Sequence, residues 1–174
     1  MVKNMWSTTS TLCAAVLLLA VCACGEEGDA GFSTEEFAPN TGANEIVNDV
    51  YVRNAFIVGG PAGEPLPPGS GVPLYVTLVN QRTEPDRLVS VSASPTFEGF
   101  RVRGGGLDLP VRQPVGGDVN PQALLTGSTG DLRSGTYLPV SFRFQDAGTV
   151  RVQVPVLPPS QWRATYSPWP SPGS

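Results

Sequence analysis

Cys24 is the residue of this chain whose surroundings most clearly prescribe a chemical reaction. The run Val21-Cys22-Ala23-Cys24 closes an apolar stretch that begins at Leu12, and Gly25-Glu26-Glu27 follows it. In bacterial lipoprotein precursors a small residue precedes the cysteine, the cysteine thiol is joined to diacylglycerol, and signal peptidase cuts between the two residues. Ala23 and Cys24 supply that pair, so we expect lipidation at Cys24.

The segment before Cys24 has the layout of a signal peptide. Lys3 and the amino terminus supply its positive charge, and an apolar run of about ten residues follows. A membrane-spanning helix needs about 20 such residues, and no later stretch reaches that length. We therefore expect residues 1–23 to be removed. Two alternatives are a secretory peptide cut elsewhere, which leaves a free cysteine, and lipidation of Cys22, which bulky Val21 disfavours.

Several residue types are absent from the expected mature chain. The sequence has no histidine, and its lysine and both methionines lie in the signal segment: Lys3, Met1 and Met5. This composition excludes Ser-His-Asp and Cys-His catalysis, Ser-Lys dyads, Schiff-base chemistry, P-loops and histidine-bound zinc or copper. All three cysteines precede residue 25. Only the lipidated Cys24 survives processing, so we expect no disulfide.

Carboxylates are the general acid or base groups that remain. Asp108, Asp118 and Asp131 fall in turn-rich segments, and two of them facing one cleft would suit glycoside hydrolysis. Their spacing does not support such a pair, because Asp in a turn is ordinary turn chemistry. No Asp-x-Asp-x-Asp loop indicates a calcium site. We therefore expect turn residues here and no enzymatic activity.

Residues 24–45 differ in composition from the remainder of the chain. They are rich in Gly, Glu, Thr and Asn and contain few large apolar side chains. Such a composition is typical of a flexible linker, and about 20 residues of flexible chain span on the order of 25 Å. The segment is therefore predicted to be an acidic tether between a membrane anchor and a folded domain.

Apolar side chains recur with a period of two from residue 46 onward, which predicts β-strands. The clearest pair is 138–144 and 149–156, joined by Gln145-Asp146-Ala147-Gly148 with Gly148 at positive φ. About seven strands and no helical period predict an antiparallel, Ig-like β-sandwich over residues 46–156. Residues 157–174 are rich in Pro and Ser, so we expect a disordered tail. Its aromatic residues are candidates for docking in a groove or on cell-wall polymer: Trp162, Tyr166 and Trp169.

Four segments, in this order, resemble the PCu(A)C family of periplasmic copper chaperones. They are residues 50–58, 73–80 (PLYVTLVN), 84–91 (EPDRLVSV) and 140–156 (VSFRFQDAGTVRVQVPV). The resemblance covers residues 46–156 and implies a cupredoxin-like sandwich.

The resemblance also implies where a metal site would lie. In that family two loops supply His and Met ligands to copper(I), and the corresponding segments here, 94–100 and 124–130, are SPTFEGF and LLTGSTG. Neither contains a thiolate, thioether or imidazole, the ligands that copper(I) prefers. The chain therefore resembles the actinobacterial lipoproteins of the LpqE-like group, which keep the domain without its metal ligands.

These observations predict a lipid-anchored protein on the extracytoplasmic face of the cell membrane. We expect it to act as a binding or accessory protein for an envelope protein or a cell-wall partner, without a catalytic, cofactor or metal residue. The alternative is copper handling in which a partner supplies the ligands. Nucleic acid is not expected as a partner, because the formal net charge is −4 and no basic patch occurs.

Overall fold

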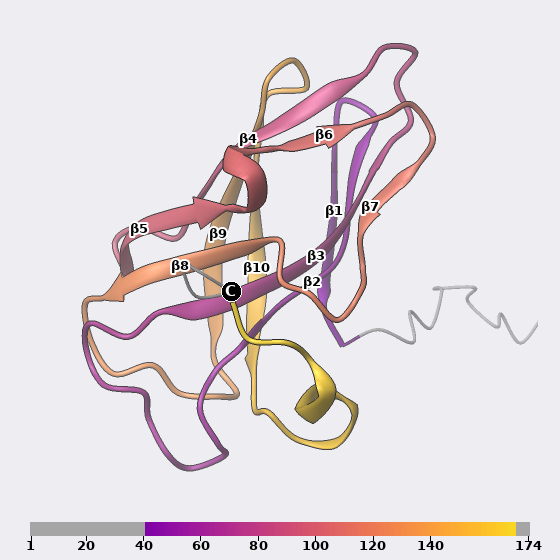
Figure 1. Cartoon of the computed structure of the whole chain (residues 1–174). Coiled ribbons are helices and arrows are strands. Elements are labelled where there is room, and N and C mark those ends of the chain that lie inside the picture. The colour runs from indigo at the N-terminus through magenta and orange to yellow at the C-terminus, as the bar shows by residue number, and fades with distance from the viewer. Residues whose placement is uncertain (1–40, 170–174) are drawn as a thin grey trace, which may run out of the picture. The chain divides into compact units, whose positions relative to one another are not determined.

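The computed structural model describes residues 41–169, which form ten β-strands and two short 3-10 helices (Figure 1). The strands are β1 (Ala43–Val47), β2 (Val50–Val58), β3 (Val72–Asn80), β4 (Asp86–Ser92), β5 (Phe97–Val102), β6 (Leu107–Leu109), β7 (Pro114–Gly116), β8 (Ala123–Ser128), β9 (Tyr137–Phe144) and β10 (Thr149–Leu157). The helices are η1 (Arg103–Gly105) and η2 (Gln161–Thr165). The predicted signal peptide, residues 1–23, and Cys24 lie outside the described residues.

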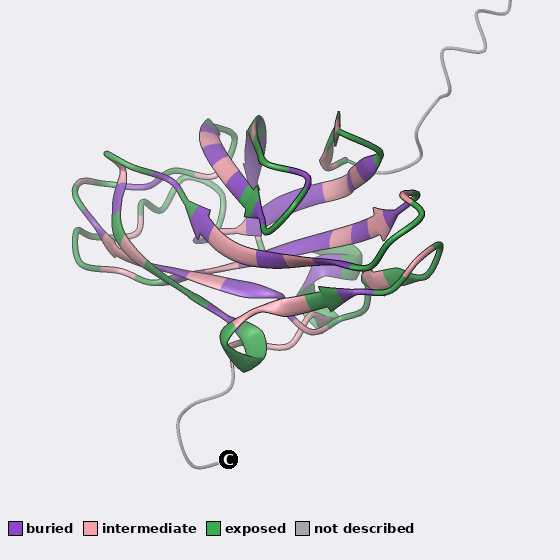
Figure 2. Cartoon of the chain, turned by 90° about the horizontal axis from the view of Figure 1, so that it is seen from above, coloured by how far each residue is buried: buried purple, intermediate pink, exposed green. Residues whose placement is uncertain are grey.

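The strands follow one continuous hydrogen-bonded path. Its order is β5-β8-β3-β2-β10-β9-β4-β6, with β1 added beside β2 and β7 beside β3. All pairs are antiparallel except β2 with β10, where Val156 and Leu157 pair in parallel with Ile57 and Val58. This pair joins the two halves of the path, and the buried positions lie mainly on the strands (Figure 2). The predicted all-β sandwich is confirmed, although the pairing is not antiparallel throughout.

Period-two alternation places the core residues on β3. Leu74, Val76 and Leu78 are buried, as expected for a strand with neighbours on both edges. The neighbours of β3 are β2 on one side and β8 with β7 on the other. β3 is therefore an interior strand of the path.

A β-bulge interrupts the alternation of β2. Its register with β3 shifts by one residue between Arg53 and Phe56, and Asn54 has a φ of 49°. One extra residue in a strand reverses which side chains face inward. Val52 faces the core before the bulge and Ile57 faces it afterwards, so Phe56 lies on the opposite face.

The hydrophobic core lies wholly between Val50 and Val156. Its fully buried members come from both halves of the strand path, including Leu78, Leu88 and Phe142. A chain that begins at Gly25 retains every one of these residues, so we expect it to fold without the signal segment.

The predicted hairpin of β9 and β10 is confirmed. The strands pair antiparallel from Arg143 with Thr149 to Tyr137 with Pro155. The Phe144 amide donates to the Gly148 carbonyl at 2.8 Å, and Gly148 has a φ of 92°. The loop therefore has the geometry that its sequence predicts.

Two predicted boundaries are wrong within the described residues. The tether was expected over 24–45, but β1 begins at Ala43 and pairs with β2. The tail was expected to be disordered from residue 157, but residues 158–169, here called the C-terminal strap, include η2 and pack on the sheet. Composition favoured disorder in both cases, and pairing or aromatic contacts with distant residues overrode it.

Candidate functional site

The two segments that match the copper loops of the PCu(A)C family lie side by side. β5 and β8 pair antiparallel, with Phe97 opposite Ser128 and Gly99 opposite Thr126. Thr129 donates its amide to the Thr96 carbonyl at 2.9 Å and its hydroxyl to the Pro95 carbonyl at 3.1 Å. The fold thus brings the two loops together although their metal-binding residues are missing.

The surface at this place is a pocket of about 320 Å³. Its lining combines hydroxyls, one carboxylate and two aromatic rings: Ser92, Ala93, Ser94, Pro95, Phe97, Glu98, Gly99 and Phe100. None of these groups is a soft ligand, and the described residues contain no cluster of three or more His, Cys, Asp or Glu able to hold a metal. The residues present therefore do not fit copper(I).

The three aspartates considered as catalytic carboxylates have separate surroundings. Asp108 in β6 forms an ion pair with Arg87 across the β4–β6 pair. Asp118 accepts from the Asn120 amide at 2.9 Å, which is a local turn contact. Asp131 is exposed beyond β8. Within the described chain no hydrogen bond or ion pair joins any two of them.

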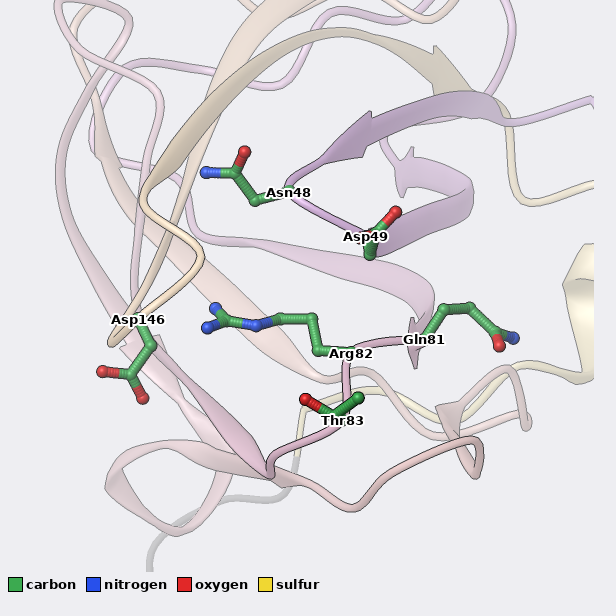
Figure 3. Close-up of a pocket in the computed structure, with 6 residues that line it drawn as sticks. All are labelled: Asn48, Asp49, Gln81, Arg82, Thr83 and Asp146. Carbon is green, nitrogen blue, oxygen red and sulfur yellow. The ribbon is translucent and has the colours of Figure 1, made fainter.

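A polar pocket of about 400 Å³ lies where three turns meet (Figure 3). The β1–β2 turn, the β3–β4 turn and the β9–β10 loop supply its lining: Asn48, Asp49, Gln81, Arg82, Thr83 and Asp146. Figure 3 shows the Arg82 side chain extending toward Asn48 and Asp146, whereas Gln81 points away. The side chains that line this pocket can hydrogen-bond a polar group. Two buried residues, Asp86 and Asn80, hold the turns that carry them.

Asp86 is the first of these buried residues. Its carboxylate accepts from the backbone amides of Arg87, Asp146 and Ala147 at 2.7, 3.0 and 2.8 Å. It also accepts from Arg82 at 3.2 Å, and its side chain is fully buried. A carboxylate with four donors is well satisfied in a low-dielectric site. Asp86 therefore ties the β9–β10 loop and Arg82 to the start of β4.

Asn80 is the second buried residue. Its amide nitrogen donates to the carbonyls of Glu84 and Leu109 at 2.8 and 3.0 Å, and its oxygen accepts from the Arg82 amide. The sequence pattern alone assigned no individual role to Asn80 or Asp86. The burial of Asn80 could have been inferred from its position, because Asn80 continues the inward-facing alternation of Leu74, Val76 and Leu78.

An aromatic cluster covers the outer face of β2 and β3. Phe56 and Tyr75 stack with ring centroids 5.1 Å apart, and the strap adds Tyr166 edge-on at 4.7 Å from Tyr75. Trp162 lies edge-on to Phe56 at 5.7 Å. The Tyr75 hydroxyl donates to the Ser167 carbonyl at 2.6 Å. The strap therefore buries two rings that point away from the main core.

Burial of this cluster changes the acidity of its phenols. Desolvation, with a smaller contribution from Tyr166, raises the pKa of Tyr75 from 10.0 to about 12. Desolvation and then the negative charge of Asp118 raise the pKa of Tyr166. Both phenols are therefore neutral hydrogen-bond donors at ordinary pH.

Comparison with protein families gives a match over residues 46–156. The matching family is described as "Putative lipoprotein LpqE-like". The chain belongs to the LpqE-like family. The match ends one residue before the end of β10, so the strap lies outside it. The comparison with curated proteins finds no match.

Solved structures of PCuAC domains share the fold of this LpqE-like chain. The "Apo PCuAC domain from PmoF1" has a TM-score of 0.55 and 20% identity, covering 66% of this chain and 97% of that one. The "Copper-bound PCuAC domain from PmoF2" has a TM-score of 0.55 and 21% identity, covering 67% and 98%. The predicted resemblance to both the PCu(A)C fold and the LpqE-like group is confirmed. In residues 41–169, no helix is long and apolar enough to span a bilayer.

Proposed function

We propose that this chain is a lipid-anchored, extracytoplasmic accessory protein whose PCuAC-like domain binds a partner in the cell envelope and does not catalyse a reaction. The observation that carries the anchoring is the Ala23-Cys24 pair at the end of an apolar signal segment. The family description as a lipoprotein supports the same conclusion. Lipid on Cys24 would hold the sandwich at the outer surface of the membrane.

Lipidation of Cys24 is tested by metabolic labelling with a palmitate analogue and by membrane fractionation. We expect the wild-type chain to carry label and to sediment with membranes, whereas Cys24→Ala loses both. Cys22→Ala is the matched control and retains both, because it leaves the Ala23-Cys24 pair intact. Label that survives in Cys24→Ala, or is lost in Cys22→Ala, would contradict the proposal.

The proposed binding role rests on a contrast with PCuAC domains. The chain has their fold, but the β5 and β8 segments lack side chains that suit copper(I). The β5–β8 segments are adjacent as in a two-loop site, yet their side chains offer hydroxyls and Glu98 instead of soft ligands. Affinity capture of the lipidated chain from envelope extract should recover a reproducible partner. The variants Glu98→Arg and Phe100→Asp, both in the pocket lined by residues 92–100, should reduce that recovery. Arg151→Gln on β10 should not.

Copper handling with ligands supplied by a partner is the second candidate. The adjacency of the β5 and β8 segments favours it, because a partner's ligands could meet there. Residues 25–174 alone should show no sub-micromolar copper(I) binding against a competing chelator, since they contain no His, Met or free thiol. Tight copper(I) binding by these residues alone would contradict both the accessory role and copper handling with ligands supplied by a partner. Binding that appears only with the captured partner would support the second candidate.

A further inference from the structure

The C-terminal strap and the sheet line an open pocket separate from the two described above. Its volume is about 400 Å³, and it lies between the 59–71 loop, the start of β3 and residues 159–168. Most of the lining is apolar: Val58, Leu66, Val72, Pro73, Tyr75, Pro159, Ala164, Tyr166 and Pro168. The pocket thus has the size and character of a site for a small apolar molecule.

Arg163 is the one charged side chain in this lining. It is 8% exposed. Its Nε donates to the Pro158 carbonyl at 2.9 Å and a terminal nitrogen lies 3.4 Å from the Ser160 hydroxyl. Its guanidinium lies 5.1 Å from the centre of the Trp162 ring. All of these partners are neutral.

No described carboxylate balances the charge of Arg163. The ion pairs among residues 41–169 are Arg82 with Asp86 and Arg87 with Asp108. A buried cation without an anion is costly, whereas a guanidinium binds a carboxylate through charge-assisted hydrogen bonds. The pocket therefore combines an apolar surface with a lining residue, Arg163, that has no anionic partner among the described residues.

We infer that this pocket binds a fatty carboxylate, with the chain against the apolar wall and the carboxylate on Arg163. The volume lies at the small end of the range of about 300–1,000 Å³ for small-molecule sites. That size suits one acyl chain better than the two chains of a phospholipid. The site depends neither on Cys24 nor on the pocket lined by residues 92–100, so it goes beyond the proposed function.

Calorimetric titration of residues 25–174 with decanoate and with decan-1-ol tests the inference. The two probes share a chain and differ in head-group charge. We expect decanoate to bind at least about tenfold more tightly, as expected for a charge-assisted hydrogen bond to a buried guanidinium. Equal affinity for the two probes, or binding of neither, would overturn the inference. Decyl phosphate binding more than tenfold tighter than decanoate would overturn the assignment to a carboxylate.

Substitutions of Arg163 test whether the preference for decanoate over decan-1-ol depends on this side chain. Arg163→Gln should reduce the preference for decanoate to within about twofold, and Arg163→Lys should retain it. Arg151→Gln, at an exposed position of β10, should leave it unchanged. A preference that survives in Arg163→Gln would contradict the assignment. Near-ultraviolet circular dichroism shows whether Arg163→Gln releases the strap. If it does, the wild-type comparison and Arg163→Lys still decide the outcome.

Discussion

The two faces of β2 and β3 are built from different side chains and covered in different ways. The inner face is mostly aliphatic, with Val52, Ile57 and Leu74 packed into the sandwich core. The outer face carries Phe56 and Tyr75, which are covered by the strap from the end of the chain. Both faces lie within the family match, whereas the strap that covers the outer face lies beyond it.

The largest expected effect comes from the inner side. Phe142 in β9 is fully buried in the core, and Phe142→Ala should lower the free energy of unfolding by about 3–5 kcal/mol through lost burial and cavity formation. Urea denaturation of residues 25–174 measures this loss. A loss below about 1 kcal/mol would show that the core tolerates large cavities.

The second-largest expected effect on stability concerns Asp86, the buried carboxylate at the start of β4. Asp86→Ala removes the acceptor for three backbone amides and Arg82, and should cost about 3 kcal/mol. Asp108→Ala is the matched control, because the Asp108 side chain is 80% exposed and exposed pairs contribute about 0–1 kcal/mol. Similar losses in the two variants would contradict the structural role of Asp86.

A third expected effect concerns the outer face. Removal of the strap by a stop after Leu157 exposes Phe56 and Tyr75 but leaves the inner core intact. We expect a folded domain that is less stable by about 2 kcal/mol, because aromatic pairs and two hydrogen bonds, from the Tyr75 hydroxyl to the Ser167 carbonyl and from the Ser167 amide to the Val119 carbonyl, are lost. Denaturation together with circular dichroism measures this. Complete unfolding of the truncated chain would show that the two faces are not independent.

The smallest expected effect is a dependence of stability on alkaline pH. Tyr75 has a pKa of about 12 when folded and 10.0 as its ordinary value, so the unfolded chain loses this proton first. Its contribution is complete below pH 10 and is lost progressively as the pH rises from 10 toward 12. Phenolate absorbance and denaturation at each pH measure the effect. Tyr75→Phe should lose less stability over this interval, because it cannot ionise.

Local alternation was sufficient to predict β3, the β9–β10 hairpin and the sandwich, because these elements depend on neighbouring residues and a repeated apolar face. The bulge at Asn54 was not predicted, since one inserted residue leaves no mark in composition. The buried positions of Asn80 and Asp86 depend on partners from other elements.

The strap was missed for a related reason. Its many prolines and serines are typical of disorder, and its order depends on Phe56 and Tyr75, about a hundred residues earlier in the chain. In the candidate metal region, by contrast, the resemblance singled out two segments, 94–100 and 124–130, that the structure shows to be adjacent. It placed them by comparison with a family, which includes long-range pairing that a single sequence does not display.

The parallel pair of β2 and β10 has a consequence for how the chain acquires its structure. β2 is the first long strand and β10 is the last strand of the described chain, and their pairing joins the two halves of the strand path. Contacts between such distant segments form late and slow folding. The two halves of the strand path therefore cannot be joined until β10, the last strand, has been synthesised.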